Sequence, residues 1–120
     1  MELGSPVPIL RMFDVEKARE FYLGFLGFSV EFEHRFEPTA PLYMGISRSG
    51  CRLHLSEHYG DACPGSSVRI PVTDIEALHG ELTAKTYAYC RPGIESMPWG
   101  AREVRVGDPF GNRVVFFQNN

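Results

Sequence analysis

The hydrophobic pattern of the first half predicts a strand followed by a helix. Residues 7–12 form a short apolar run, which is typical of a strand. Asp14 follows this run and is a favoured helix N-cap, and beyond it apolar residues recur at helical spacing. Gly24 and Gly27 end the pattern, because glycine commonly terminates helices. The apolar face of the predicted helix carries Val15, Ala18, Phe21, Tyr22 and Phe25.

Three further strands are predicted in the first half. Residues 28–35 alternate between apolar and polar side chains, as a strand with two different faces does. Residues 42–47 and 51–57 are predicted to pair as a hairpin around the turn at 48–50. Alternation along the first of these strands places on one face Phe28, Val30, Phe32 and His34.

The second half follows the same order of elements. Residues 68–72 predict a strand, and Asp74 is predicted to cap a helix that ends near Lys85. The Asp-Pro-x-Gly sequence at 108–111 favours a tight turn, because proline presets φ and glycine accepts positive φ. The remaining predicted elements are a strand at 87–91, a Pro- and Gly-rich loop at 92–100, and a hairpin of residues 102–106 and 113–118.

Two sequence echoes indicate an internal duplication. The Asp-Val-Glu of residues 14–16 returns as the Asp-Ile-Glu of 74–76, and the Gly-x-Arg of 50–52 returns at 111–113, each about 60 residues further on. We therefore predict an α+β fold of two tandem βαβββ modules, about residues 6–60 and 66–120, in a single domain spanning 1–120. A curved mixed sheet is expected to surround a cleft, with the inward side chains of both modules sharing one concave surface.

Composition narrows the function classes. A chain of 120 residues with 43% hydrophobic content can fill one continuous core. The net charge of −3 disfavours nucleic acid, which usually binds a basic face. No apolar run is long enough to span a bilayer, and no secretory pattern is visible. The three widely spaced cysteines suggest neither disulfides nor a zinc knuckle, so we expect a cytoplasmic protein without membrane contact.

Several motifs resemble the glyoxalase, bleomycin-resistance and dioxygenase superfamily, whose fold is also called vicinal oxygen chelate. They are the paired Asp-[Val/Ile]-Glu helix starts, the Glu-Phe-Tyr of residues 20–22 before the Leu-Gly-Phe of 26–28, and the Asp-Pro-Phe-Gly-Asn of 108–112. The resemblance covers essentially the whole chain, and the order and spacing of the motifs make it specific. It implies the fold of two βαβββ modules expected above.

The resemblance also allows the metal chemistry of the superfamily to be tested by position. Its enzymes hold a divalent ion with one His or Glu from each of four strands. The corresponding positions here are Val7, His54, Ser67 and Val115. Only His54 is a good ligand, and metal affinity requires three or four donors at fixed geometry. We therefore expect no metal site and no cofactor.

A second metal pattern occurs at residues 54–58, His-Leu-Ser-Glu-His. This pattern serves metalloproteases on a helix, where the two histidines share a face. Here the segment is predicted as a strand, on which Glu57 points away from His54 and His58, so we interpret it as a polar strand end. A glyoxalase-like or dioxygenase-like metalloenzyme that combines His54 with Glu57 or His58 remains the alternative.

Aromatic residues are the strongest candidates for ligand contact. The Pro-Trp-Gly of residues 98–100 resembles a loop of bleomycin-resistance proteins, in which the tryptophan clamps flat heteroaromatic rings; Trp99 as a lid over the domain edge is the alternative. Phe32 matches a second ring-stacking position of that branch, and Phe36 is a looser match. Stacked aromatic pairs add about 0.5–1.5 kcal/mol beyond area burial, although Phe32 also suits a core position.

Charged residues give a weaker signal. Arg102 and Glu103 follow the Trp99 loop and either orient a polar ligand group or form a surface ion pair. The charges expected around the cleft are mixed, and exposed charges on a strand usually form a solvated face. The carboxylates, which would suit a cationic ligand, are Glu31, Glu33, Glu37, Glu57 and Asp61, and the basic residues among them are His34, Arg35, Arg48 and Arg52.

Taken with the resemblance, these residues predict a metal-independent binding protein rather than an enzyme. It would sequester a planar, cationic antibiotic such as bleomycin, or a metabolite, in an aromatic-lined cleft. The candidate binding residues are Trp99, Phe32, Phe36, His54, Arg102 and Glu103, with no catalytic residue. The resemblance implies a homodimer whose clefts are shared between subunits. A fold member that binds an unrelated metabolite is a further possibility.

Overall fold

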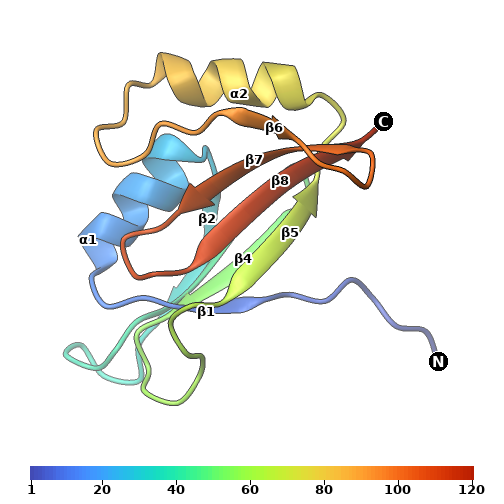
Figure 1. The fold of residues 1–120 in the computed structure, drawn as a ribbon. Coiled ribbons are helices and arrows are strands. Elements are labelled where there is room, and N and C mark those ends of the chain that lie inside the picture. The colour runs from blue at the N-terminus through green and yellow to red at the C-terminus, as the bar shows by residue number, and fades with distance from the viewer.

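The computed structural model describes residues 1–120 and contains two four-stranded mixed sheets of identical design (Figure 1). Their orders are β1-β4-β3-β2 and β5-β8-β7-β6, with β1 parallel to β4 and β5 parallel to β8. This repeated topology confirms the α+β fold and the order of elements that the sequence echoes indicated. The strands are β1 (Ile9–Arg11), β2 (Ser29–His34), β3 (Tyr43–Arg48), β4 (Cys51–Ser56), β5 (Ser67–Pro71), β6 (Ile94–Ser96), β7 (Ala101–Gly107) and β8 (Arg113–Asn119).

Each module contributes one helical segment with an aspartate cap. In the first, α1 (Val15–Ala18) continues directly into a π-helical segment, η1 (Arg19–Phe25), and Asp14 accepts a hydrogen bond from the Lys17 amide at 3.0 Å. In the second, Asp74 caps α2 (Ile75–Ala84) in the same way, through the Ala77 amide at 3.0 Å. Both caps satisfy amides that would otherwise lack partners, as the sequence predicted. No helix is long and apolar enough to cross a membrane.

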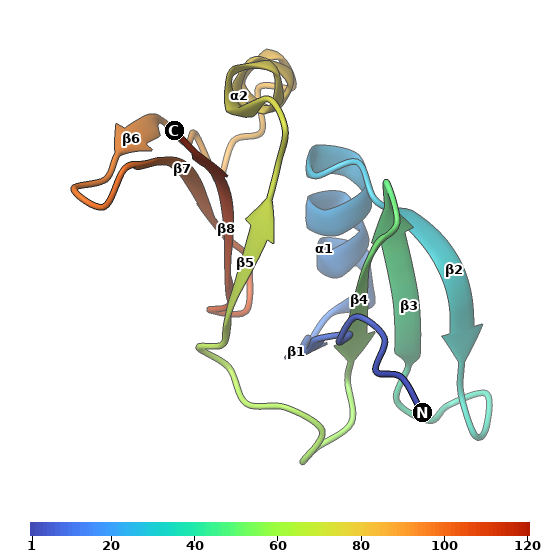
Figure 2. The ribbon, with the colours of Figure 1, turned by 90° about the vertical axis from the view of Figure 1, so that its right-hand side faces the viewer.

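The core lies between the two sheets. Figure 2 shows the α1 helix standing between them, with each sheet on one side of it. Buried residues from both sheets join those of both helices in a single apolar cluster, including Phe21 of η1, Leu82 of α2, Ile46 of β3 and Val104 of β7. One face of each sheet is therefore packed inward, and the opposite face is directed outward. Instead of one curved sheet around a cleft, the chain has two separate sheets whose outward faces point away from each other.

A buried hydrogen-bond network joins the two modules. The Tyr22 hydroxyl of η1 donates to Oδ2 of Asp108 at 2.6 Å, and Nδ2 of Asn112 donates to the same atom at 2.9 Å. Asn112 Nδ2 also donates to the Arg11 carbonyl of β1 at 2.8 Å. Burial, followed by the neighbouring carboxylate, raises the pKa of Tyr22, so its hydroxyl remains a donor. The turn after β7 is thereby fixed against the helix of the other module.

The structure corrects two details of the predicted strands. A bulge in β2 sets Val30 opposite the buried Ile46, but Phe32 opposite Gly45, so these two residues lie on different faces instead of the same one. In the second module, the strand predicted at 87–91 is wrong, because Tyr87 stacks on Phe25 at 4.7 Å and the strand forms later, as β6. The bulge matters for function, since it brings Phe32 onto the outward face.

We expect Tyr22→Phe to destabilise the fold by about 1–3 kcal/mol, because it removes a hydrogen bond from a buried carboxylate. Urea unfolding followed by circular dichroism measures this change. Tyr87→Phe is the matched control, since Tyr87 packs through its ring, and it should change the free energy of unfolding by less than about 0.5 kcal/mol. Equal effects of the two substitutions would contradict the role of the Tyr22 hydroxyl.

Candidate functional site

Three rings gather on the outward face of the first sheet. Phe32 of β2, Tyr43 of β3 and His54 of β4, here called the aromatic platform, belong to adjacent strands. The Phe32 and Tyr43 rings are nearly parallel, with centroids 6.2 Å apart, and His54 meets each of them edge-on at 5.2 Å. Phe32 keeps 42% of its surface exposed. The platform can therefore offer a ring face to a flat ligand.

Gly45 makes room for this arrangement. It lies opposite both Phe32 and His54 in the sheet, and the Phe32 ring covers it. A Cβ atom at Gly45 would come within 3 Å of several atoms of that ring. Glycine is thus required here for a close approach between an aromatic ring and the backbone, so that Phe32 lies flat on the sheet.

A hydrogen bond orients the imidazole of the platform. The Tyr43 hydroxyl and Nδ1 of His54 are 2.7 Å apart. Burial raises the pKa of Tyr43, and the charge of Asp61 adds to this effect, so the phenol remains protonated. The contact engages Nδ1 of His54 and holds the ring in place, so Nε2 is the ring nitrogen left for a ligand.

Phe36 lies beside the platform rather than in it. It follows β2 in a loop, is 77% exposed, and packs edge-on against His34 and His58. His58 itself lies beyond the end of β4 at Ser56. The residues of the His-Leu-Ser-Glu-His pattern therefore lie on β4 and on the segment that directly follows it, as expected, and not on a helix.

The remaining predicted site residues belong to the second module. Trp99 is 62% exposed in the turn between β6 and β7. Glu103 lies on the outward face of β7, where it is buried beneath Arg69 and Arg105. Arg102 is on the opposite face of the strand and forms an ion pair with Glu76 of α2 at 2.8 Å. Arg102 and Glu103 thus do not act together, and within one chain none of the three approaches the platform.

The carboxylates predicted to attract a cationic ligand already have partners, except Glu37. Glu31 forms an ion pair with Arg52 at 3.5 Å, and Glu33 faces the helical side and pairs with Arg19. Glu57 accepts a hydrogen bond from the Leu42 amide at 3.0 Å. Asp61 accepts one from the Ser56 hydroxyl at 2.6 Å. The outward face of the first sheet is consequently aromatic more than it is anionic.

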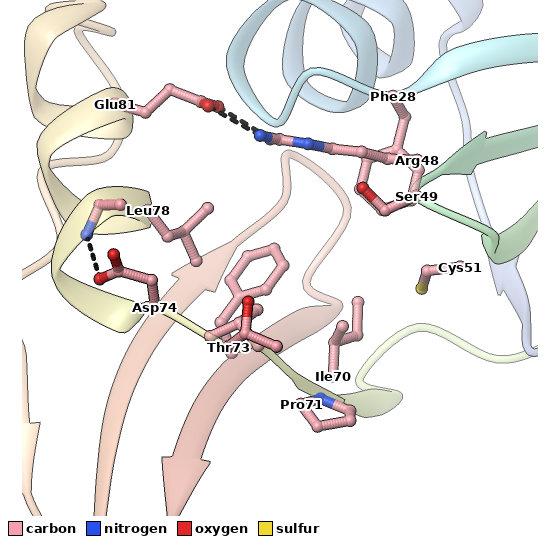
Figure 3. Close-up of a pocket in the computed structure, with 13 residues that line it drawn as sticks. Phe28, Arg48, Ser49, Cys51, Ile70, Pro71, Thr73, Asp74, Leu78 and Glu81 are labelled. Atoms are coloured by element: carbon pink, nitrogen blue, oxygen red, sulfur yellow. Dashed lines mark hydrogen bonds and ion pairs between the residues drawn. The ribbon is translucent and has the colours of Figure 1, made fainter.

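A cavity of about 420 Å³ lies at the seam between the modules (Figure 3). Its walls are mainly apolar, and its polar rim is engaged in holding the modules together: Arg48 donates twice to Glu81 and once to the Leu26 carbonyl. Asp74 is occupied as the helix cap. Burial raises the pKa of the Cys51 thiol, which keeps it from being a reactive thiolate. We therefore assign the cavity to module packing and the site to the outward faces.

The residues present do not fit a divalent metal site. The strand neighbour of His54 on β1 is Ile9 rather than Val7, and the neighbour of Val115 on β5 is Arg69 rather than Ser67. Correcting the register by two residues adds no ligand. No group of three or more His, Cys, Asp or Glu side chains in this chain could hold a metal ion.

Several residues of these faces were missed from the sequence. Tyr43 and Gly45 were placed in a predicted strand, but nothing marked their face as functional. Arg69 and Arg105 were treated as ordinary strand residues. They could have been found from the pairing register of the strands, because residues opposite His54 and Glu103, and residues two positions along the strand from those, lie on the same face of the sheet.

Comparisons with known proteins identify the family and the fold of the chain. A family model described as "Glyoxalase superfamily protein" matches residues 2–120. A bleomycin-binding protein from bleomycin-producing Streptomyces verticillus, solved with copper(II)-bleomycin, is 32% identical, with a TM-score of 0.75 over 100% of this chain and 99% of that one. Comparison with curated proteins gives no match.

Two more distant structures share the fold. A bleomycin resistance determinant encoded on the transposon Tn5 is 21% identical, with a TM-score of 0.77 over 98% of this chain and 99% of that one. A glyoxalase-related enzyme from Clostridium phytofermentans is also 21% identical, with a TM-score of 0.79 over 100% of this chain and 98% of that one. At this identity the likeness establishes the fold alone, which binding proteins and enzymes have in common.

We expect Gly45→Ala to displace the Phe32 ring from the platform, because the new methyl group would occupy its place. The free energy of unfolding should fall by no more than about 1 kcal/mol, since a half-exposed ring can turn into solvent. Nuclear Overhauser contacts between the Phe32 and His54 rings should disappear. Gly80→Ala, in α2 with open space around it and no positive φ, should preserve them. Retention of the ring contacts in Gly45→Ala would contradict the role assigned to this glycine.

Proposed function

This chain belongs to the glyoxalase superfamily, and we propose that it is a metal-independent binding protein that captures a planar small molecule by stacking. The aromatic platform is the observation that carries the proposal. Exposed rings held in fixed orientation on a sheet suit a flat heteroaromatic ligand. The 32% identity to a bleomycin-binding protein over the whole chain adds support.

The mechanism is sequestration by mass action. Protection requires the protein to exceed the ligand in concentration and to bind it with a low Kd. No bond need be made or broken, and the residues on the outward faces offer binding groups rather than a nucleophile with an adjacent base. The metalloenzyme alternative has less support, because Glu57 is committed to the Leu42 amide and His58 lies outside the strand that carries His54.

We further propose that the cleft is completed by a second copy of the chain. The platform lies on the outward face of the first sheet, while Trp99 and Glu103 belong to the second sheet, whose outward face points the other way. A two-fold dimer that sets the first sheet of one copy opposite the second sheet of the other creates two equivalent clefts. Trp99 of one copy would then close over a ligand stacked on Phe32 of its partner.

The expected ligand charge needs revision. The sequence prediction of a cationic ligand rested on carboxylates that are, apart from Glu37, paired within the chain. We retain the planar ring as the recognised feature. A bleomycin-like drug serves as a first probe, because it is the ligand of the 32% identical relative.

Titration of copper(II)-bleomycin into chelator-treated protein tests the proposal. We expect saturable binding with quenching of the sole tryptophan, Trp99, in the wild-type protein. Phe32→Ala should weaken binding about tenfold or more, because it removes both stacking and apolar contact area. Phe13→Ala is the matched control, since this phenylalanine is similarly exposed but packs against Phe110. Binding that is unchanged in Phe32→Ala would contradict the platform.

Mixing of two defective variants tests the shared cleft. In a dimer of Phe32→Ala with Trp99→Ala subunits, one cleft contains both substitutions and the other contains neither. We therefore expect the mixture, after reversible dissociation and reassembly, to recover wild-type affinity in one cleft of each mixed dimer, which neither variant shows alone. Light scattering should report a dimer throughout. No recovery from a mixture proven to contain mixed dimers would place Phe32 and Trp99 in the same chain's site or in separate sites.

A further inference from the structure

The outward face of the second sheet carries a fixed arrangement of positive charge. Arg69 of β5, Val115 of β8 and Arg105 of β7 lie directly opposite one another across three adjacent strands. Their side chains therefore leave the same face of the sheet. Both guanidinium groups extend toward Glu103, the next outward residue along β7. Val115 between them is only 6% exposed, so the two arginine side chains form the accessible surface of the row.

Glu103 holds both guanidinium groups in place. Arg69 Nη1 is 2.9 Å from Oε2 of Glu103, while Arg105 donates to Oε1 from Nε at 3.2 Å and from Nη2 at 3.1 Å. The Arg69 guanidinium also lies over the Phe117 ring, with its central carbon 4.4 Å from the ring centre. Orientation by a carboxylate and a ring lowers the entropy that these arginines would lose on binding a ligand.

The arginines retain capacity for a further partner. Each guanidinium carries five N–H donors, and Glu103 engages only part of them. Each arginine side chain remains 47% exposed, although Glu103 is fully buried. Burial alone would raise the pKa of the Glu103 carboxyl, but hydrogen bonds from Arg69 and Arg105 hold it below its usual value. The carboxylate stays charged, and two positive groups surround one negative group.

The neighbouring charges locate the positive region. Arg113 lies on the same face, in the row beyond Val115, opposite Ser67 and Gly107. The exposed Glu95 lies on the other side, opposite Glu103 on the edge strand β6. The positive region is thus centred on the Arg69–Val115–Arg105 row, and Glu95 bounds it.

We propose that Arg69 and Arg105 bind an acidic group of the ligand, a carboxylate, sulfonate or phosphate, whose planar part stacks on the aromatic platform. This inference rests on the proposed function and names its ligand class. Planar acidic oxygens accept paired N–H donors from arginine, which makes such contacts strong and directional. In the proposed dimer, the arginine row of one copy faces the platform of the other. The ligand class is then an aromatic acid rather than an aromatic cation.

A matched pair of probes tests the inference. 2-Naphthoate and 2-naphthylmethylammonium share the same ring system and differ in the sign of their charge. Isothermal titration at moderate ionic strength should show that wild-type protein binds naphthoate at least tenfold more tightly. Inorganic phosphate, without any ring, should shift the Nε–H resonances of Arg69 and Arg105 in a ¹⁵N-labelled sample.

Substitutions assign the preference to residues. Arg69→Gln and Arg105→Gln should each remove most of the preference for naphthoate, while leaving the affinity for the ammonium probe equal or higher. Arg102→Gln is the matched control, because it makes the same charge change on the opposite face of β7 and should preserve the preference. The double variant Glu103→Gln/Arg105→Gln removes one negative and one positive charge, so it leaves no uncompensated carboxylate and is expected to fold. It should also lose most of the preference for naphthoate. Phe32→Ala should weaken both probes equally.

Each outcome decides between the two proposals. Phe32-dependent binding of both probes without a charge preference would overturn the acidic ligand class and leave the stacking function intact. A preference that survives in both arginine variants would also overturn it. Phosphate-induced shifts of the arginine resonances without binding of either naphthyl probe would support the acid contact and overturn the planar cleft. Absence of both responses would overturn both.

Discussion

The docking of the two modules depends on the buried contact of Tyr22 and Asn112 with Asp108. This carboxylate is 9% exposed and accepts four hydrogen bonds, from the Tyr22 hydroxyl, the Asn112 side chain and the amides of Phe110 and Asn112. A buried carboxylate is costly unless its oxygens are satisfied in this way. Because the donors come from both modules, the network is satisfied only when the modules are docked. Asn112 extends the link to β1 through the Arg11 carbonyl.

Docking in this manner determines which sheet faces are available. The helices fill the space between the sheets, so the inward faces are consumed by the core and the outward faces remain for ligand. A second polar link, between Arg48 and Glu81, closes the seam near α2, with Lys85 donating to the Phe25 carbonyl. Neither outward face is enclosed within a single chain. The proposed second copy would cover them, and stacking is strongest when a ring is held on both sides and water is excluded.

Much of the fold could be predicted because its signals are local. Asp14 and Asp74 cap their helices through side-chain contacts three residues away, and the turn at Ser49 and Gly50 has the positive φ values of a two-residue hairpin. The bulge in β2 could not be predicted, because it is defined by pairing with β3. The strand expected at 87–91 failed for a related reason, since Tyr87 packs against a helix of the other module.

The candidate site could likewise be predicted only where its residues depend on local sequence. Phe32 and His54 were predicted individually and lie together on the platform, although Phe32 reaches that face only through the bulge. Arg102 and Glu103 are neighbours in sequence, but a strand directs consecutive side chains to opposite faces, which separates them. Phe36 lies beside the platform in the same module, whereas Trp99 belongs to the other module and would meet a platform only in the proposed dimer.

Net charge was a poor guide to the electrostatics of these faces. The chain carries 15 acidic and 12 basic residues, and the expectation of a cationic ligand rested on the carboxylates near the cleft. Exposed charges that pair with each other are screened and contribute little to the field at a site. Glu31, Glu33 and Glu57 are each paired with an arginine, whereas Arg69 and Arg105 share a single carboxylate and remain half exposed. What a ligand encounters is the charge left uncompensated after internal pairing, and on the second sheet that charge is positive.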